Sequence, residues 1–176
     1  MHRVYLAGPD VFRPDAAEHG RKLVELCSDY GFEGVFPLDD TVVLSEGRSP
    51  QELATQIYHG NVSRIDSCDA VIANLDFFRG LEPDSGTCFE VGYAAARGKV
   101  VIGYIPDEGS IPDRIRRRAP SFPQSGTDTN GWRVEDFGLP LNLMLAVSCR
   151  IVVGDACTAL EALRSTSMRS CRGGLK

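Results

Sequence analysis

The stretch Ala70-Val71-Ile72-Ala73 is a short apolar run with β-branched residues at its centre, and it is too short to form a helix. A continuous apolar run of this length is typical of a strand that is buried on both faces, as in a parallel sheet. Four similar runs occur elsewhere in the chain, at residues 4–7, 34–36, 100–104 and 150–153. The sequence therefore predicts a sheet of about five buried strands.

Helical patterns lie between these runs. The first places Leu23, Leu26 and Cys27 on one face, and a later one ends before Gly98, a good C-terminal stop. The expected helices cover residues 16–30, 50–68, 89–97, 141–148 and 156–164. Strands that alternate with helices favour a wound parallel α/β sheet. Such sheets bind ligands outside the carboxyl ends of their strands.

The length of 176 residues fits one domain, which we assign to residues 1–164. Residues 107–137 are poor in aliphatic side chains and contain several prolines and glycines, so we predict one long loop there. Residues 165–176 are polar and include Gly173-Gly174, which predicts a flexible tail.

The composition excludes several classes of protein. A net charge of −5 disfavours nucleic acid as a partner, and no apolar run is long enough to span a membrane. The six cysteines form no C-x-x-C pair, only three histidines are present, and the N-terminus does not resemble a signal peptide. We therefore expect reduced thiols, a cytoplasmic location and no metal site.

The segment that carries chemistry is Arg79-Gly80-Leu81-Glu82-Pro83-Asp84-Ser85-Gly86-Thr87-Cys88-Phe89-Glu90-Val91-Gly92, between the strand at residues 70–73 and the next helix. A wound sheet keeps its ligand site at such a position. Two carboxylates, Asp84 and Glu90, suit cleavage of a glycosidic bond. One attacks or stabilises the anomeric carbon while the other protonates or holds the leaving group.

A structural alternative exists for Glu90. The spacing Thr87-x-x-Glu90 fits a helix capping box, in which the glutamate binds only backbone donors. The density of acidic residues and glycines in this one segment argues for a functional site instead.

The same segment resembles the signature of the nucleoside 2-deoxyribosyltransferase family in the pattern Arg-Gly-x-Glu-Pro-Asp-x-Gly-Thr-x-Phe-Glu-x-Gly. Two further segments resemble the family, Tyr5-Leu6-Ala7-Gly8-Pro9-Asp10-Val11-Phe12 and Pro140-Leu141-Asn142-Leu143-Met144. Weaker matches are Pro37-Leu38-Asp39 and the stretch from Asn61 to Cys68-Asp69-Ala70. Together the matches span roughly residues 3–153.

This resemblance implies a flavodoxin-like (Rossmann-like) wound parallel sheet flanked by helices, and it implies no metal or organic cofactor. Glu90 is expected to be the nucleophile that forms a covalent deoxyribosyl-enzyme. Asp84 is expected to contact the nucleobase and relay its proton. Tyr5 is expected to orient the Glu90 carboxylate through its hydroxyl.

The resemblance also implies a set of substrate-binding residues: Gly8, Phe12, Asp39, Asn61, Arg79, Gly80, Gly86, Asn142 and Met144. Gly8 and Phe12 are expected to line the base pocket. Asn142 is expected to reach the sugar hydroxyls in the site of a neighbouring subunit, with Met144 beside it, so the protein should be a homo-oligomer, at least a dimer.

Two features depart from the family pattern. Some bacterial members carry an aspartate that contacts the base where this chain has Asn61, so the proton relay is expected to depend on Asp84 alone. Some bacterial members also end in a tyrosine whose terminal carboxylate enters the site, whereas this chain continues to Lys176.

The first hypothesis is an enzyme that exchanges nucleobases on 2′-deoxyribose with net retention and some hydrolysis. Its partners are a 2′-deoxynucleoside and a free nucleobase, and the resemblance to protozoan members favours purine salvage. A second hypothesis is an N-glycosidase that hydrolyses 2′-deoxynucleoside 5′-monophosphates. The arginines of the cluster 114–118 are its only support, and we interpret them as a solvated face. A third is a non-catalytic nucleotide-binding module.

Overall fold

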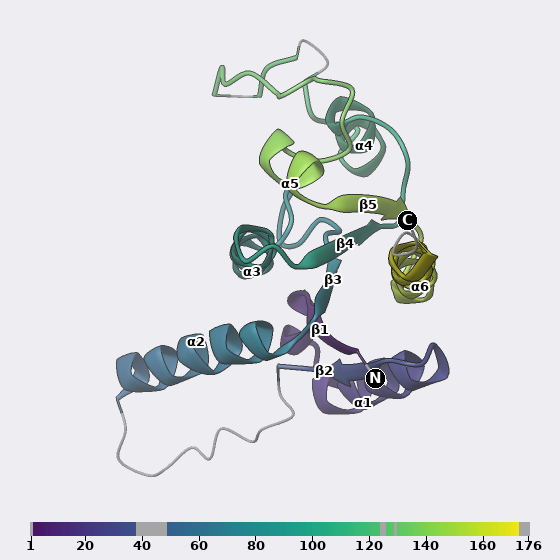
Figure 1. Ribbon diagram of the computed structural model, residues 1–176. Coiled ribbons are helices and arrows are strands. Elements are labelled where there is room, and N and C mark those ends of the chain that lie inside the picture. The colour runs from purple at the N-terminus through teal and green to yellow at the C-terminus, as the bar shows by residue number, and fades with distance from the viewer. Residues whose placement is uncertain (1, 38–48, 124–125, 129, 173–176) are drawn as a thin grey trace.

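Five parallel strands form the centre of the molecule (Figure 1). They are β1 (Arg3–Ala7), β2 (Glu33–Val35), β3 (Ala70–Asn74), β4 (Val100–Ile105) and β5 (Arg150–Val153), in the spatial order β2-β1-β3-β4-β5. This computed structural model describes residues 2–37, 49–123, 126–128 and 130–172. The predicted flavodoxin-like α/β fold with a wound parallel sheet is confirmed.

Helices cover both faces of the sheet. They are the 3-10 helix η1 (Pro9–Phe12) and the α-helices α1 (Ala16–Asp29), α2 (Pro50–Ser67), α3 (Ser85–Ala96), α4 (Ile111–Arg118), α5 (Leu143–Ser148) and α6 (Ala156–Arg172). In Figure 1, α1 and α6 lie on one side of the sheet, and α2, α3 and α5 lie on the other.

The side chains of β1 alternate between the two faces of the sheet, and each face has its own hydrophobic core. Val4 and Leu6 pack with Cys27 of α1 and Leu160 of α6 in one cluster of buried side chains. Tyr5 and Ala7 point the other way, into the second cluster, whose members include side chains of α2, α3 and α5. Successive side chains of a strand point to opposite faces, so Tyr5 lies on the side that carries α3.

Helix α3 begins at Ser85, four residues before the predicted start. The Asp84 side chain accepts a hydrogen bond from the backbone N–H of Thr87 at 2.8 Å and so caps the helix. The helix ends at Ala96, one residue before the predicted end, and Gly98 beyond it has a φ of 70°, which a residue without a side chain adopts readily.

The prediction of an uninterrupted loop over residues 107–137 was wrong, because α4 lies within it. Ser110 and Asp113 form a reciprocal capping box and Pro112 occupies the first turn, so a start signal is present. The helix was missed because only Ile111 and Ile115 supply its apolar face. The third buried position is Arg114.

Helix α6 also differs from the prediction. It continues to Arg172, into the segment 165–176 that was expected to be a flexible tail. Residues 173–176 lie outside the described part of the chain. Within that part, no helix combines the length and the apolar character needed to cross a membrane.

Candidate functional site

The site lies where the chain leaves β1 and β3. With the order β2-β1-β3-β4-β5, the connections after β1 and after β3 run to opposite sides, and the crevice between them is the usual ligand position in such a sheet. Gly8 follows β1 and passes so close to β3 that a Cβ atom on it would lie 2.9 Å from the Cβ of Asn74. The absence of a side chain at Gly8 therefore keeps the two strand ends together.

Glu90 lies at the centre of this site. Its Oε1 accepts a hydrogen bond from the Tyr5 hydroxyl at 2.6 Å and one from Nδ2 of Asn61, on α2, at 3.4 Å. Two elements, β1 and α2, thus each bring one donor side chain to a single carboxylate oxygen of α3. Glu90 is the sixth residue of α3, and the helix is capped by Asp84, so the alternative of a Thr87–Glu90 capping box does not apply.

Burial changes the acidity of this pair. Burial raises the pKa of Glu90 to about 7 and the negative charge of Asp84 adds to the increase, whereas the hydrogen bond from Tyr5 opposes it. Burial also raises the pKa of the fully buried Tyr5 hydroxyl well above its usual range, and the Glu90 carboxylate adds to that shift. Tyr5 therefore remains a proton donor to Glu90 throughout the physiological pH range.

Asp84 lies one turn and a half before Glu90, and the two charges are close enough to interact. Its Oδ2 accepts hydrogen bonds from the backbone N–H and the hydroxyl of Thr87, at 2.8 and 2.9 Å. A Cβ atom at Gly86 would lie 3.1 Å from this oxygen, so Gly86 leaves room for the cap. The other oxygen, Oδ1, has no hydrogen-bond partner among the described residues and can accept one from a ligand.

An aromatic and cationic stack joins the loops that follow β1 and β3. Phe12 lies on Phe78 with the ring centroids 5.4 Å apart, and the guanidinium of Arg79 lies 5.0 and 4.6 Å from the two centroids. Arg79 has a φ of 53°, a left-handed conformation that residues with side chains rarely adopt. Phe12 is 56% exposed, so the stack offers a flat apolar surface to solvent. Gly80, the next residue of the loop, is exposed.

Asn142 and Met144 lie apart from Glu90 within the chain. Both line an open groove of about 540 Å³ between α3 and α5, together with Cys88, Gly92 and Ala95 of α3. At 3.6 residues per turn, these three α3 residues lie on the side of the helix opposite Glu90. Met144 is 72% exposed. One chain alone therefore does not bring Asn142 to the carboxylate.

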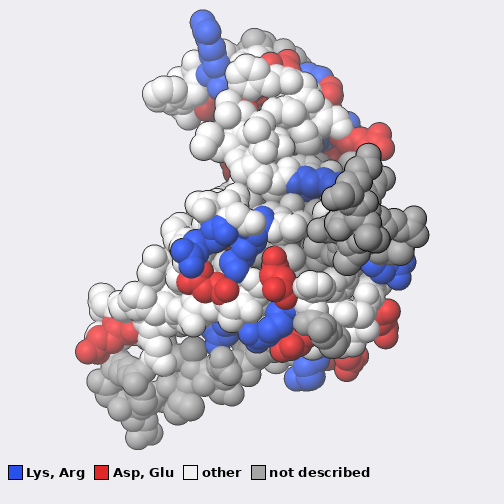
Figure 2. Space-filling view, viewed as in Figure 1, with Lys and Arg blue, Asp and Glu red and all other residues white. Residues whose placement is uncertain are grey.

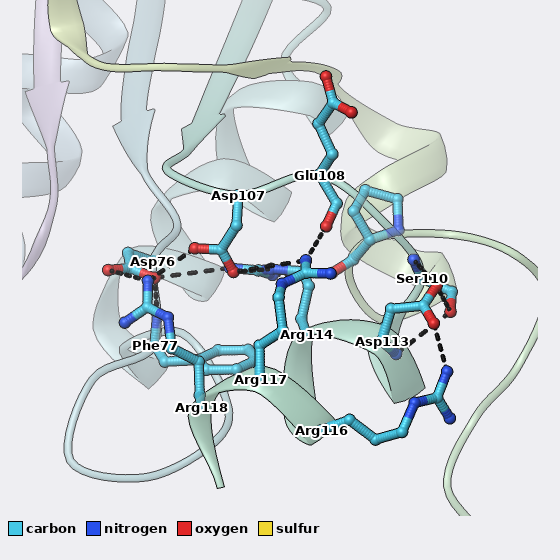
Figure 3. A network of polar contacts seen from close by, with 11 residues as sticks. Asp76, Phe77, Asp107, Glu108, Ser110, Asp113, Arg114, Arg116, Arg117 and Arg118 are labelled. Carbon is cyan, nitrogen blue, oxygen red and sulfur yellow. Dashed lines mark hydrogen bonds and ion pairs between the residues drawn. The ribbon is translucent and has the colours of Figure 1, made fainter. Parts of the chain in front are cut away.

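Of the four arginines of α4, Arg114 alone departs from the solvated face that the sequence suggested, and the other three are exposed (Figure 3). Arg114 is fully buried, lies 3.5 Å from Asp76 and 3.4 Å from Asp107, and stacks over the Phe77 ring at 4.3 Å. Arg118 also pairs with both carboxylates, at 3.1 and 2.8 Å. On the face shown in Figure 2, basic and acidic side chains are interspersed.

Two contributors near the site were not found in the sequence. Arg114 ties α4 to the loop after β3, a role that could have been suspected because Asp76 and Asp107 each follow a strand end. Glu135 accepts a hydrogen bond from Nδ2 of Asn142 at 2.9 Å. Glu135 lies beside a second acidic residue, Asp136, in the segment before α5, and nothing in the pattern identified it.

One predicted site residue, Asp39, lies outside the described residues. Among the residues that are described, no group of three or more His, Cys, Asp or Glu side chains is arranged to hold a metal ion. The donors assembled around Glu90 are a phenol and an amide.

Fold and site together define a flavodoxin-like α/β protein with a partly buried carboxylate, held by a tyrosine, at the ligand edge of its sheet. The sequence profile of the family described as nucleoside 2-deoxyribosyltransferase matches residues 4–144. An uncharacterized protein of Schizosaccharomyces pombe, C191.05c, is 36% identical over 155 residues, which cover 80% of this chain and 74% of that protein.

Solved structures agree with the profile. The 2-desoxiribosyltransferase from Leishmania mexicana superposes with a TM-score of 0.70 at 30% identity, covering 94% of this chain and 98% of that one. A conserved protein from Enterococcus faecalis V583 has a TM-score of 0.59 at 18% identity, covers 97% and 99% of the two chains, and shares the fold. The chain belongs to the nucleoside 2-deoxyribosyltransferase family and is an enzyme of the glycosyl-transferring or N-glycosidase kind.

Proposed function

We propose that this protein transfers 2-deoxyribose from a 2′-deoxynucleoside to a free nucleobase through a covalent intermediate on Glu90. The observation that carries the proposal is the 2.6 Å hydrogen bond from Tyr5 to a Glu90 carboxylate that makes no capping contact with its helix. The family profile and the similarity to the Leishmania mexicana enzyme support the same substrate class.

In the first step, a carboxylate oxygen of Glu90 attacks C1′ and the C1′–N bond breaks. The electron pair of that bond leaves with the nucleobase, which takes a proton relayed by Asp84. The Tyr5 hydrogen bond fixes one oxygen of Glu90 and leaves Oε2 for C1′. In the second step, a nitrogen of the acceptor base attacks C1′, the bond to Glu90 breaks, and the acceptor's proton returns through Asp84. Two inversions give net retention.

Water in place of the acceptor base releases free deoxyribose, so slow hydrolysis should accompany exchange. The absence of a 2′-hydroxyl leaves room for the carboxylate beside C2′. Phe12 and Arg79 are proposed to form one wall of the base pocket, with Gly8 and Asn61 at its floor. Gly80 and Gly86 are proposed to let the loop and the helix start approach the substrate. A purine preference is the expectation for the donor.

A second subunit is proposed to complete the site. Asn142 lies on the far side of α3 from Glu90, and Met144 beside it is exposed, which supports their contact with a neighbouring molecule. We therefore expect a homo-oligomer in which each Glu90 meets the Asn142 of a partner. This arrangement, the purine preference and a cytoplasmic location are parts of the proposal.

The alternative is hydrolysis of 2′-deoxynucleoside 5′-monophosphates, which requires a cradle for a phosphate dianion. The loop after β1 instead carries Asp10, which accepts a hydrogen bond from Asn74 at 3.2 Å and pairs with His19 at 3.1 Å. The arginines of α4 that could bind a phosphate are paired with Asp76 and Asp107. These contacts favour the nucleoside over its monophosphate.

Chromatography of reactions with deoxyadenosine or its 5′-monophosphate, each with and without a second free base, tests the proposal. Exchange should require the free base as acceptor and should prefer the nucleoside. Release of free adenine from the monophosphate alone, at the same rate with and without acceptor, would establish the hydrolase instead. Binding of either compound without turnover would establish the non-catalytic module.

A further inference from the structure

The backbone that leads to Asn142 is fixed in place. Arg114 donates from Nη1 to the carbonyl of Pro140 at 2.8 Å, and Leu141 is buried in the core cluster that includes Tyr5 and Val91. Figure 3 shows Arg114 extending from α4 into the polar network that it forms with Asp76 and Asp107. The position of Asn142 is therefore set, and only the orientation of its carboxamide remains to be determined.

Two neighbours determine that orientation. The Oδ1 atom of Asn142 accepts a hydrogen bond from the backbone N–H of Met144 at 3.0 Å, and its Nδ2 donates to Oε2 of Glu135 at 2.9 Å. Rotating the amide by half a turn would set its NH2 group against the N–H of Met144 and its oxygen against the Glu135 carboxylate. Both contacts would be repulsive, so the observed orientation is strongly preferred.

Glu135 is itself held in place. Its second oxygen, Oε1, accepts a hydrogen bond from the backbone N–H of Leu143, in the first turn of α5, at 2.7 Å. A carboxylate bound at both oxygens has little rotational freedom, and an ionised acceptor makes a stronger hydrogen bond than a neutral one. Any side chain with a single acceptor can satisfy only one of these two donors.

We propose that Glu135 is a positioning residue that orients the Asn142 carboxamide toward the sugar hydroxyls in the partner's site. This inference rests on the proposed function. A primary amide has two N–H donors and an oxygen with two lone pairs. Glu135 and Met144 occupy one of each, so they decide which donor and which lone pair face the substrate.

The location of Asn142 gives this role an unusual consequence. Asn142 lines the groove on the side of α3 opposite Glu90. A change at Glu135 should therefore impair the site that contains the Glu90 of the other subunit, while the Glu90 of its own subunit remains intact. A residue that only stabilises the fold would impair its own subunit's site instead.

The first test compares Glu135→Gln with Asp136→Asn. Asp136 is the adjacent acidic residue, and among the residues that the structure describes it accepts a hydrogen bond only from the backbone N–H of Gly138, at 3.3 Å. Glu135→Gln should lower kcat/KM for base exchange by roughly tenfold, the typical value of one oriented hydrogen bond, and Asp136→Asn should leave it unchanged. In an Asn142→Ala background, Glu135→Gln should have almost no further effect, because the two residues act as one unit.

The second test mixes subunits. Hetero-oligomers of Glu90→Gln and Glu135→Ala subunits, purified through two different tags, should regain about half of the wild-type exchange activity per pair, because one of the two symmetric sites is complete. If Glu135→Ala subunits do not fold, as judged by circular dichroism, Glu135→Gln subunits take their place.

The outcomes separate the two claims. If the wild-type protein exchanges bases but the mixed oligomers gain no activity, the role proposed for Glu135 is overturned. An unchanged kcat/KM in Glu135→Gln, or an equal loss in the Asn142→Ala background, would do the same. Absence of exchange in the wild-type protein would overturn the proposed function itself.

Discussion

Glu90 and Asp107 are both carboxylates near the ligand edge of the sheet, but their surroundings differ. Glu90 is hydrogen-bonded to two neutral groups, Tyr5 and Asn61, and burial raises its pKa to about 7. Asp107 pairs with Arg114 and Arg118, and these charges hold its pKa below the ordinary value although burial opposes them. A carboxylate surrounded by cations holds segments together, whereas one surrounded by neutral donors remains available for chemistry.

The largest effect on activity is expected at Glu90, the carboxylate that is proposed to attack the substrate. Glu90→Gln should reduce base exchange by at least about a thousandfold while the fold is retained, because an amide cannot attack C1′. Chromatography of the released and acquired bases measures the loss, and Glu18→Gln on the exposed side of α1 is the control. Exchange at the wild-type rate in Glu90→Gln would show that the reaction does not use this carboxylate.

The same variant should be more stable than the wild-type protein at high pH. The folded-state pKa of Glu90 is raised from 4.5 to about 7, so ionising Glu90 destabilises the folded state. This destabilisation is absent well below pH 4.5 and complete above pH 7. Glu90→Gln removes this cost, and the gain should reach about 3 kcal/mol at pH 8 and vanish below about pH 4. Urea unfolding at the two pH values measures it.

Removing an arginine partner of Asp76 and Asp107 should instead lower the stability of the protein. Arg114→Met leaves Asp76 and Asp107 without their buried partner and should lower the free energy of unfolding by about 3 kcal/mol. Arg118→Ala removes an exposed partner of the same two carboxylates and should cost less than about 1 kcal/mol. Urea denaturation compares the two variants. Equal losses would show that the burial of Arg114 does not matter.

The next effect concerns the hydrogen bond that keeps Glu90 acidic enough to act. The Tyr5 hydroxyl lowers the pKa of Glu90, so Tyr5→Phe should raise it further. The acid limb of the profile of kcat/KM against pH should then move to a higher pH, and the rate at pH 7 should fall by roughly tenfold. A profile that stays in place, or moves to lower pH, would contradict the role assigned to Tyr5.

A small effect is expected where the loop after β1 meets the end of β3. Gly8→Ala would place a Cβ atom 2.9 Å from both the Cβ of Asn74 and Oδ2 of Asp10, and the shift it requires should cost about 1–2 kcal/mol of stability. Gly92→Ala meets nothing within 4 Å and lies inside α3, so it should leave stability unchanged or raise it slightly. Thermal unfolding of the pair distinguishes crowding from a general effect of adding a methyl group.

The sequence predicted the sheet well for a physical reason. The three central strands, β1, β3 and β4, are mostly buried apolar runs, and such a run is unambiguous once helices lie between the strands. The bounds of β5 agree with the prediction, and those of the other strands differ by about one residue. The sequence also pointed to Glu90 as a candidate, because the signature segment concentrates its acidic residues and glycines at one strand end.

The parts that were missed depend on contacts between distant segments. Helix α4 was hidden because one of its three buried positions is occupied by Arg114, which is buried only through Asp76, Asp107 and Phe77. The link between Glu135 and Asn142 likewise depends on how the segment before α5 folds back. Local patterns alone do not specify which distant residues form such pairs.

The central claim is that Glu90 bonds covalently to the anomeric carbon of the substrate. Mass spectrometry of peptides from protein incubated with a 2′-deoxynucleoside, without acceptor base and quenched in acid, tests it directly. We expect a mass increase of one deoxyribosyl group on the peptide that contains Glu90, which disappears on addition of a free base and never forms in Glu90→Gln. Rapid release of the base from an enzyme whose Glu90 peptide stays unmodified, including under single-turnover conditions, would contradict the claim.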